Sequence, residues 1–213
     1  MKVIGINGSP RKEWNTATML RYALNGAASK SAETKLVHLY DIDYKGCRSC
    51  FACKEKNGKS FGHCAINDGL TSVLDEIPEV DALILGSPIY FGEVTGEMRS
   101  FLERLLFPYL LYEEGGGTLF PRKIRTAWIY TMNVPENGVK KMGLDRVFQF
   151  NESLLEMLIG PCESPMSFDT LQFKDYSKYA AGRFDATAKL KRHRDIFPDD
   201  CQKAFDLGIR IVT

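Results

Sequence analysis

The sequence predicts an α/β fold in which helices cover both faces of a parallel sheet. Short apolar segments typical of strands alternate with segments whose apolar residues recur at helical spacing. Residues 80–86 are almost continuously apolar, as expected for a strand that is buried on both faces. A chain of 213 residues is long enough for one such domain with a full core.

Five strands are expected in chain order, at residues 2–7, 33–40, 80–86, 124–131 and 162–168. Helices are expected between and after them, with apolar faces over residues 19–27, 70–77, 96–105, 144–159 and 200–211. Thr95 precedes the third of these helices and is expected to cap it. His38 lies inside the second strand with no second ligand nearby, so we interpret it as a packing or edge residue.

The overall charge argues against two classes of partner. The formal net charge is +1, which gives no field that would recruit nucleic acid or acidic lipid. The sequence contains no signal peptide and no apolar window long enough for a membrane span. We therefore expect a soluble cytoplasmic protein that binds neither nucleic acid nor membranes.

The first strand leads into a turn, residues 8–18, that is rich in small, hydroxyl and amide side chains. The turn precedes a helix, and free backbone N–H groups and the helix dipole make such a point favourable for an anion. The glycine patterns of dinucleotide and triphosphate loops are absent. The remaining donors suit one terminal phosphate, and they are Ser9, Arg11, Asn15, Thr16 and Thr18. The alternative is that Asn15 or Thr16 only caps the helix.

Two further loops follow the third and fourth strands. The first offers apolar and aromatic surface to a flat ligand through Pro88, Ile89, Tyr90, Phe91 and Gly92. Its alternative role is to cover the core. The second loop would add Thr131 and Asn133.

The segments Gly5–Arg11, Asn15–Thr18 and Ser87–Gly92 resemble the flavin loops of flavodoxin-like NAD(P)H-dependent FMN reductases. The resemblance implies a doubly wound, five-stranded parallel sheet of order 2-1-3-4-5, with FMN phosphate on the first turn and the flavin ring between the other loops. It also implies a nicotinamide cofactor, NAD(P)H, as electron donor, and it requires no catalytic side chain. The acceptor, a small molecule or a redox protein, is not specified. Ligands of such sheets bind where the strand order reverses, which is between the first and third strands.

Four cysteines at short spacing form a second chemical signal, at Cys47, Cys50, Cys53 and Cys64. Four thiolates match the needs of a [4Fe–4S] cluster or of zinc, and the same spacing also suits reduced thiols or a redox disulfide. The run resembles that of the iron–sulfur flavoproteins, although the last gap is longer than is usual there, and Ala65 stands where ferredoxin-type runs carry a proline. Because the loop leaves the second strand, we expect it at the same carboxyl edge as the flavin. The isolated Cys162 and Cys201 are expected to be buried small hydrophobes.

These observations leave three functional hypotheses. The first is an FMN-dependent oxidoreductase, the second an iron–sulfur flavoprotein that carries electrons, and the third a cysteine-based metal or redox sensor without flavin. We expect a single domain, residues 1–213, with a cysteine-rich loop at 46–68 and an irregular basic segment at 170–197. The cations of that segment are interpreted as a solvated face. The aromatic connection 107–120 suggests a homo-oligomer, a dimer or a tetramer.

Overall fold

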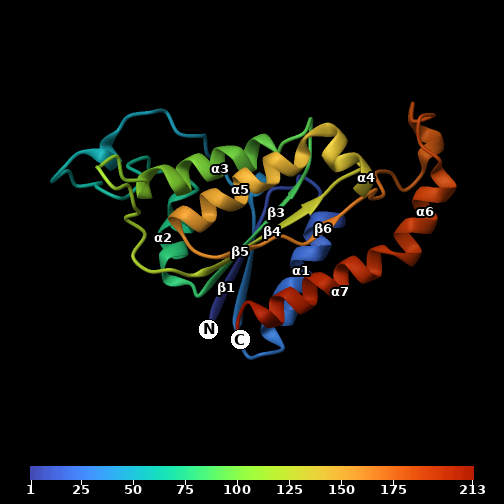
Figure 1. Cartoon of the computed structure of the whole chain (residues 1–213), viewed down its shortest axis with the longest axis horizontal. Coiled ribbons are helices and arrows are strands. Elements are labelled where there is room, and N and C mark those ends of the chain that lie inside the picture. Colours follow the sequence, from blue (N-terminus) through green and yellow to red (C-terminus); the bar gives the residue numbers. More distant parts are fainter.

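The computed structural model describes all residues, 1–213, and has one parallel sheet at its centre (Figure 1). The long strands are β1 (Lys2–Asn7), β2 (Glu33–His38), β3 (Ala82–Pro88) and β4 (Arg125–Thr131). The order across the sheet is β2-β1-β3-β4-β5, and every pairing is parallel. This confirms the predicted doubly wound, flavodoxin-like order.

The fifth position of the sheet is shared by two short strands. Both β5 (Cys162–Glu163) and β6 (Met166–Ser167) pair with β4, so the continuous strand expected over 162–168 is divided. Pro165 lies between them and has no backbone N–H for a ladder, which explains the interruption at this edge.

Helices cover the two faces unequally. One face carries α1 (Asn15–Ala28) and α7 (Phe197–Arg210), and the other carries α2 (Thr71–Glu76), α3 (Gly96–Leu106) and α5 (Leu144–Leu158). Two short helices, α4 (Glu136–Val139) and α6 (Ala186–Asp195), lie near one end of the molecule (Figure 1). Single 3₁₀ turns occupy Leu39–Asp41, Ala52–Lys54, Ile77–Glu79, Phe107–Tyr109, Lys140–Met142 and Tyr176–Lys178.

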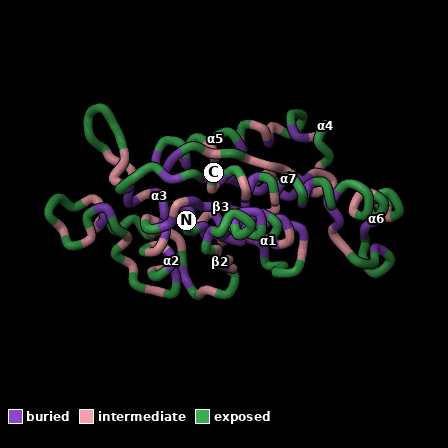
Figure 2. The backbone as a smooth tube through the Cα atoms, turned by 90° about the horizontal axis from the view of Figure 1, so that it is seen from below, coloured by how far each residue is buried: buried purple, intermediate pink, exposed green.

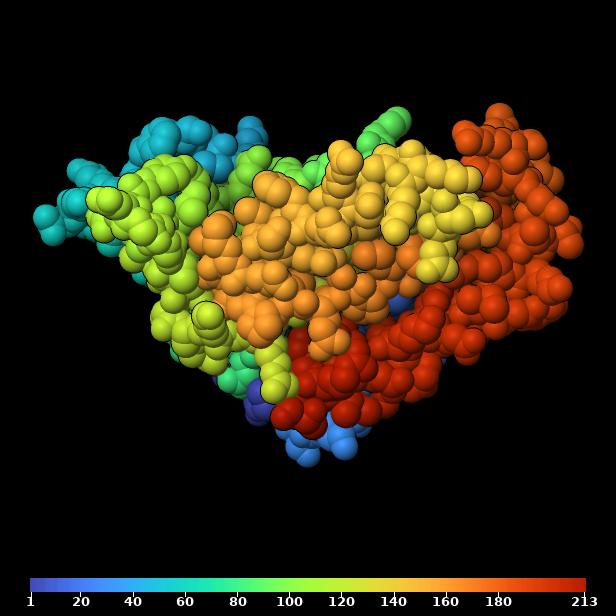
Figure 3. Space-filling view, in the orientation of Figure 1, coloured from blue at the N-terminus to red at the C-terminus, as the bar shows by residue number.

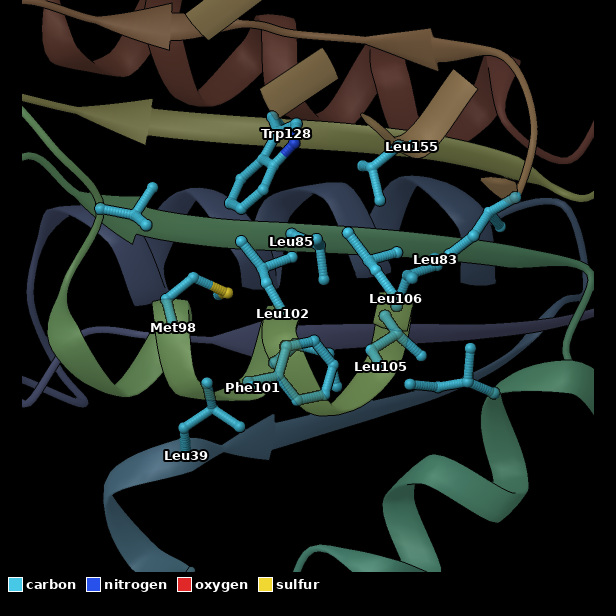
Figure 4. Close-up of a cluster of buried hydrophobic side chains, with 14 of the residues drawn as sticks. Leu39, Leu83, Leu85, Met98, Phe101, Leu102, Leu105, Leu106, Trp128 and Leu155 are labelled. Carbon is cyan, nitrogen blue, oxygen red and sulfur yellow. The ribbon is translucent and has the colours of Figure 1, made fainter. Parts of the chain in front are cut away.

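Each face of the sheet has its own apolar core. In the larger core, Leu83, Leu85 and Trp128 of the sheet pack against the apolar side of α3, which presents Phe101 and Leu102 (Figure 4). Burial of each such side chain contributes about 1.5–3 kcal/mol relative to exposure. Figure 2 shows these buried tracts through the centre of the molecule and exposed backbone at α6 and in the outer loops.

Close approach of α1 and α7 forms the second core. Gly26 and Gly208 lie at this contact, where a Cβ on Gly208 would fall 1.8 Å from the carbonyl oxygen of Ala23. The absent side chains let the two backbones touch, and α1 is fixed against the sheet.

Two further features differ from the expectations. Residues 186–195 of the segment expected to be irregular form α6, and the closing helix begins at Phe197. The cations of this segment do not all face solvent as expected, because Lys189 is buried and Arg192 pairs with Asp200 at 2.5 Å.

No helix of the chain has the length and apolar character needed to cross a membrane.

Candidate functional site

The loops that follow β1 and β3 are tied together at the carboxyl edge of the sheet. The Gly8 amide donates to the Gly86 carbonyl at 2.8 Å, and the Thr95 hydroxyl donates to the Gly8 carbonyl at 2.7 Å. Thr95 also caps α3 as predicted, because its Oγ1 accepts from the Met98 amide. The strand order reverses at this point, where ligands of such sheets bind.

The first turn of α1 presents free donors at this edge. The backbone N–H groups of Asn15, Thr16 and Ala17 donate no hydrogen bond within the chain. Trp14 stands at the N-cap position, and no side chain caps the helix. The capping alternative for Asn15 and Thr16 is therefore wrong, and the helix keeps the unpaired N–H groups that suit an anion.

Side chains of the turn instead reach other loops. The hydroxyls of Thr16 and Thr131 are hydrogen-bonded at 2.7 Å, which joins the turn to the end of β4. The Asn15 amide Nδ2 donates to the Leu171 carbonyl at 2.9 Å. Together with the loop after β3, four segments thus meet at the carboxyl edge.

One cleft brings together nine of the twelve predicted flavin-binding residues, namely Ser9, Arg11, Asn15, Thr16, Pro88, Ile89, Tyr90, Thr131 and Asn133. Thr18, Phe91 and Gly92 do not line it. Thr18 lies inside α1. Phe91 is fully exposed at a hairpin tip, where both it and Gly92 have positive φ angles, +51° and +88°. The loop after β3 projects from the upper edge of the molecule in Figure 3 (green).

The cleft also contains residues that the sequence reasoning missed, namely Trp14, Met132, Thr170, Leu171 and Gln172. The segment after β6 lies across the turn that follows β1, because the Leu171 carbonyl accepts from Trp14 Nε1 at 2.9 Å and the Gln172 carbonyl accepts from Arg11 Nη1 at 2.5 Å. Its position directly after the last strand was the available signal, since every carboxyl-end loop of the sheet is a candidate.

His38 lies at the end of β2 and outside the cleft. Its Nδ1 is 2.8 Å from Asn7 Nδ2, and burial lowers the pKa of the imidazole, although Asp41 opposes this shift. This placement agrees with the edge role expected for His38.

The cysteine loop does not lie where the sequence predicted it. After β2 the chain follows α3 from its beginning to its end: Tyr44 Oη donates to the Glu97 carbonyl at 2.6 Å, and the Cys47 amide donates to Glu103 Oε2 at 3.0 Å. Since α3 begins at the carboxyl edge and has 11 residues, its far end is about 16 Å away. The expectation that the cysteines lie at the carboxyl edge of the sheet, beside the cleft, is wrong. Figure 1 shows this loop (cyan) and α6 at opposite ends of the molecule.

The four cysteines differ in their surroundings. Burial raises the pKa of the Cys53 thiol, although the nearby Lys54 ammonium opposes this shift. Cys50 is exposed. The guanidinium of Arg104 is buried and donates through Nε to Cys64 Sγ at 2.9 Å. Thiols of this kind suit an iron–sulfur cluster or zinc, yet no three His, Cys, Asp or Glu side chains are arranged to hold a metal ion.

Comparison with known proteins places this architecture in a family. Residues 1–123, more than half of the chain, match the family model described as NADPH-dependent FMN reductase. The chain belongs to the NADPH-dependent FMN reductase family. The match includes the loops after β1 and β3 and the whole cysteine run.

Individual relatives agree with this assignment. An iron–sulfur flavoprotein from Methanocaldococcus jannaschii is 42% identical over 104 residues, which are 49% of this chain and 51% of that protein. An iron–sulfur flavoprotein from Archaeoglobus fulgidus is 36% identical over 104 residues, 49% of this chain and 48% of that protein. The chain thus spans about half the length of the curated relatives it matches. An NAD(P)H:quinone oxidoreductase from Methanothermobacter marburgensis shares the fold with a TM-score of 0.69 at 13% identity, covering 99% of this chain and 98% of that one.

Proposed function

We propose that this family member binds FMN in the cleft and passes electrons from a nicotinamide cofactor through FMN to an acceptor. The observation that carries the proposal is the meeting of four segments, those after β1, β3, β4 and β6, around a cleft at the unpaired N–H groups of α1. We propose further that residues 1–213 act as one FMN-binding domain. The family membership supports the choice of FMN over other phosphorylated ligands.

The chain's own residues would bind and orient the cofactor. Ser9, Arg11, Asn15 and Thr16, with the N–H groups of the first helical turn, would hold the phosphate. The adjoining loops after β3 and β4 would hold the ring, through Pro88, Ile89 and Tyr90 of the first and Thr131 and Asn133 of the second. The bound flavin supplies the electron-transfer chemistry. No side chain needs to act as an acid, a base or a nucleophile.

Binding of a phosphate would change one set of contacts. The side chains of Arg11, Trp14 and Asn15 now donate to the carbonyls of Leu171 and Gln172. A phosphate accepts stronger hydrogen bonds than a carbonyl because it is charged. We expect a bound phosphate to compete with these two carbonyls for the side-chain donors. The segment after β6 would then move away from the turn, or its carbonyls would share the donors with the phosphate.

The deciding experiment is a visible spectrum of protein purified without oxygen, followed by addition of NADH or NADPH. We expect the two absorption bands of bound FMN, bleached by one of the nucleotides. Absence of flavin would overturn the proposal and favour a flavin-free cysteine sensor. If neither nucleotide bleaches the bound flavin but reduced ferredoxin does, the protein is an electron carrier and not a reductase.

The second candidate function is that of an iron–sulfur flavoprotein that carries electrons. It is favoured by the four-cysteine run and by the names of the relatives that match it. Cys47, Cys50, Cys53 and Cys64 would hold the cluster after the loop rearranges. The cysteine loop lies about the length of α3 away from the cleft of the same chain. This function therefore requires a homo-oligomer in which the cleft of another copy lies close to the loop. An iron and zinc assay on the same sample tests it, with about four irons per chain expected for a full cluster.

A further inference from the structure

Lys189 is a buried cation that the proposed function has not used. It lies on α6, is only 5% exposed, and pairs with Asp169. Its Nζ also donates to Oδ1 of Asn133 and, at 3.4 Å, to the Asn133 carbonyl. An ammonium has three donors and no acceptor, so Asp169 and the two Asn133 oxygens satisfy it completely.

This contact fixes the orientation of the Asn133 side chain. An ammonium can only donate, so it selects the oxygen of the amide and turns Nδ2 away from itself. Nδ2 of Asn133 donates no hydrogen bond within the chain, although Asn133 lines the flavin cleft beside Thr131. Asn133 therefore carries an oriented but unused donor, and this residue lines the cleft.

The ion pair with Asp169 reduces any direct electrostatic effect of the Lys189 ammonium on a ligand in the cleft. Asp169 has a left-handed backbone, with φ at +49°, and its amide donates to the Val134 carbonyl at 3.0 Å. The carboxylate is thereby held beside Nζ and offsets the positive charge. The remaining effect of Lys189 on the cleft is the orientation of Asn133.

We propose that Lys189 is a positioning residue that presents Asn133 Nδ2 as a hydrogen-bond donor to a polar atom of the flavin ring. This inference rests on the proposed binding of FMN in the cleft. It gives the basic segment after β6 a role in flavin recognition that its sequence did not indicate.

A double-mutant cycle on FMN affinity tests the proposal. Asn133→Ala should raise the FMN dissociation constant about tenfold, as expected for one lost hydrogen bond, and Lys189→Met should raise it by a similar factor. The double variant should bind no more weakly than Asn133→Ala, because Lys189 acts only through Asn133. Both single variants should shift the visible bands of bound flavin in the same direction.

Two controls separate positioning from general stability. Lys191→Met removes an exposed cation from the same helix and should leave affinity and spectrum unchanged. Lys189→Arg keeps the donors and should recover most of the affinity; this variant decides the question if Lys189→Met does not fold.

Losses that add in the double variant, or Lys189 variants that bind FMN as the wild type does, would overturn the inference and leave the proposed function intact. A wild-type protein that binds no FMN would overturn both.

Discussion

Two threonines on the first turns of α1 differ in their contacts although they are only two positions apart. Thr16 is buried and bonded to the Thr131 hydroxyl at the cleft, whereas Thr18 makes no side-chain hydrogen bond and does not line the cleft. The sequence offered both as phosphate ligands because both are hydroxyl residues in one turn. Only the helix geometry separates them, since residues two apart do not share a helix face.

This difference gives a prediction about FMN affinity. Thr16→Val keeps the side-chain shape and removes the hydroxyl, so it should cost about 1.5–3 kcal/mol of FMN binding, the usual value for a hydrogen bond to a charged group. Thr18→Val should change the affinity by less than about 0.5 kcal/mol. Flavin fluorescence titrations of both variants measure the contrast. Equal losses would restore Thr18 to the phosphate site.

At the scale of elements, the contact between α1 and α7 holds α1, the helix that begins at the cleft. A methyl group on Gly208 would collide with the backbone of α1, so Gly208→Ala must separate the two helices. We expect a loss of about 1–3 kcal/mol in the free energy of unfolding, measured by urea denaturation. Gly96→Ala is the matched control, because that helical glycine faces open space and alanine favours helix there. A Gly208→Ala protein as stable as the control would contradict this account of the contact.

The sequence predicted those elements whose signals are local. The strands and the main helices follow from apolar periodicity, and the strand order follows from the resemblance of the loops. The course of the cysteine loop was not predictable, because it depends on contacts such as Cys47 with Glu103, which are 56 positions apart in the chain. The contacts of Leu171 with Asn15 and of Lys189 with Asn133 were not predictable for the same reason, because they also join distant parts of the chain. The break in the last strand does have a local signal, because Pro165 cannot donate a hydrogen bond to a neighbouring strand.

For the molecule as a whole, two thiols link stability to alkaline pH: Cys201 is buried as expected, whereas Cys162 is only half-buried. Burial raises the pKa of Cys162 to about 12 and that of Cys201 to about 11, from an ordinary value of 9.0. Above the ordinary value the unfolded chain loses these protons while the folded chain keeps them. The unfolded state then binds fewer protons, and the free energy of unfolding falls as the pH rises.

We therefore expect the free energy of unfolding to fall by about 3 kcal/mol between about pH 8 and about pH 10 through these two thiols, roughly 1.4 kcal/mol each. Urea denaturation across this range measures the slope. The Cys162→Ala/Cys201→Ala double variant should have a clearly shallower slope, whatever its absolute stability. Cys50→Ala is the matched control, because it removes a thiol that folding leaves exposed. If the double variant and the control decline as steeply as the wild type, the alkaline loss arises from other groups, such as Tyr109, whose pKa burial raises to about 12.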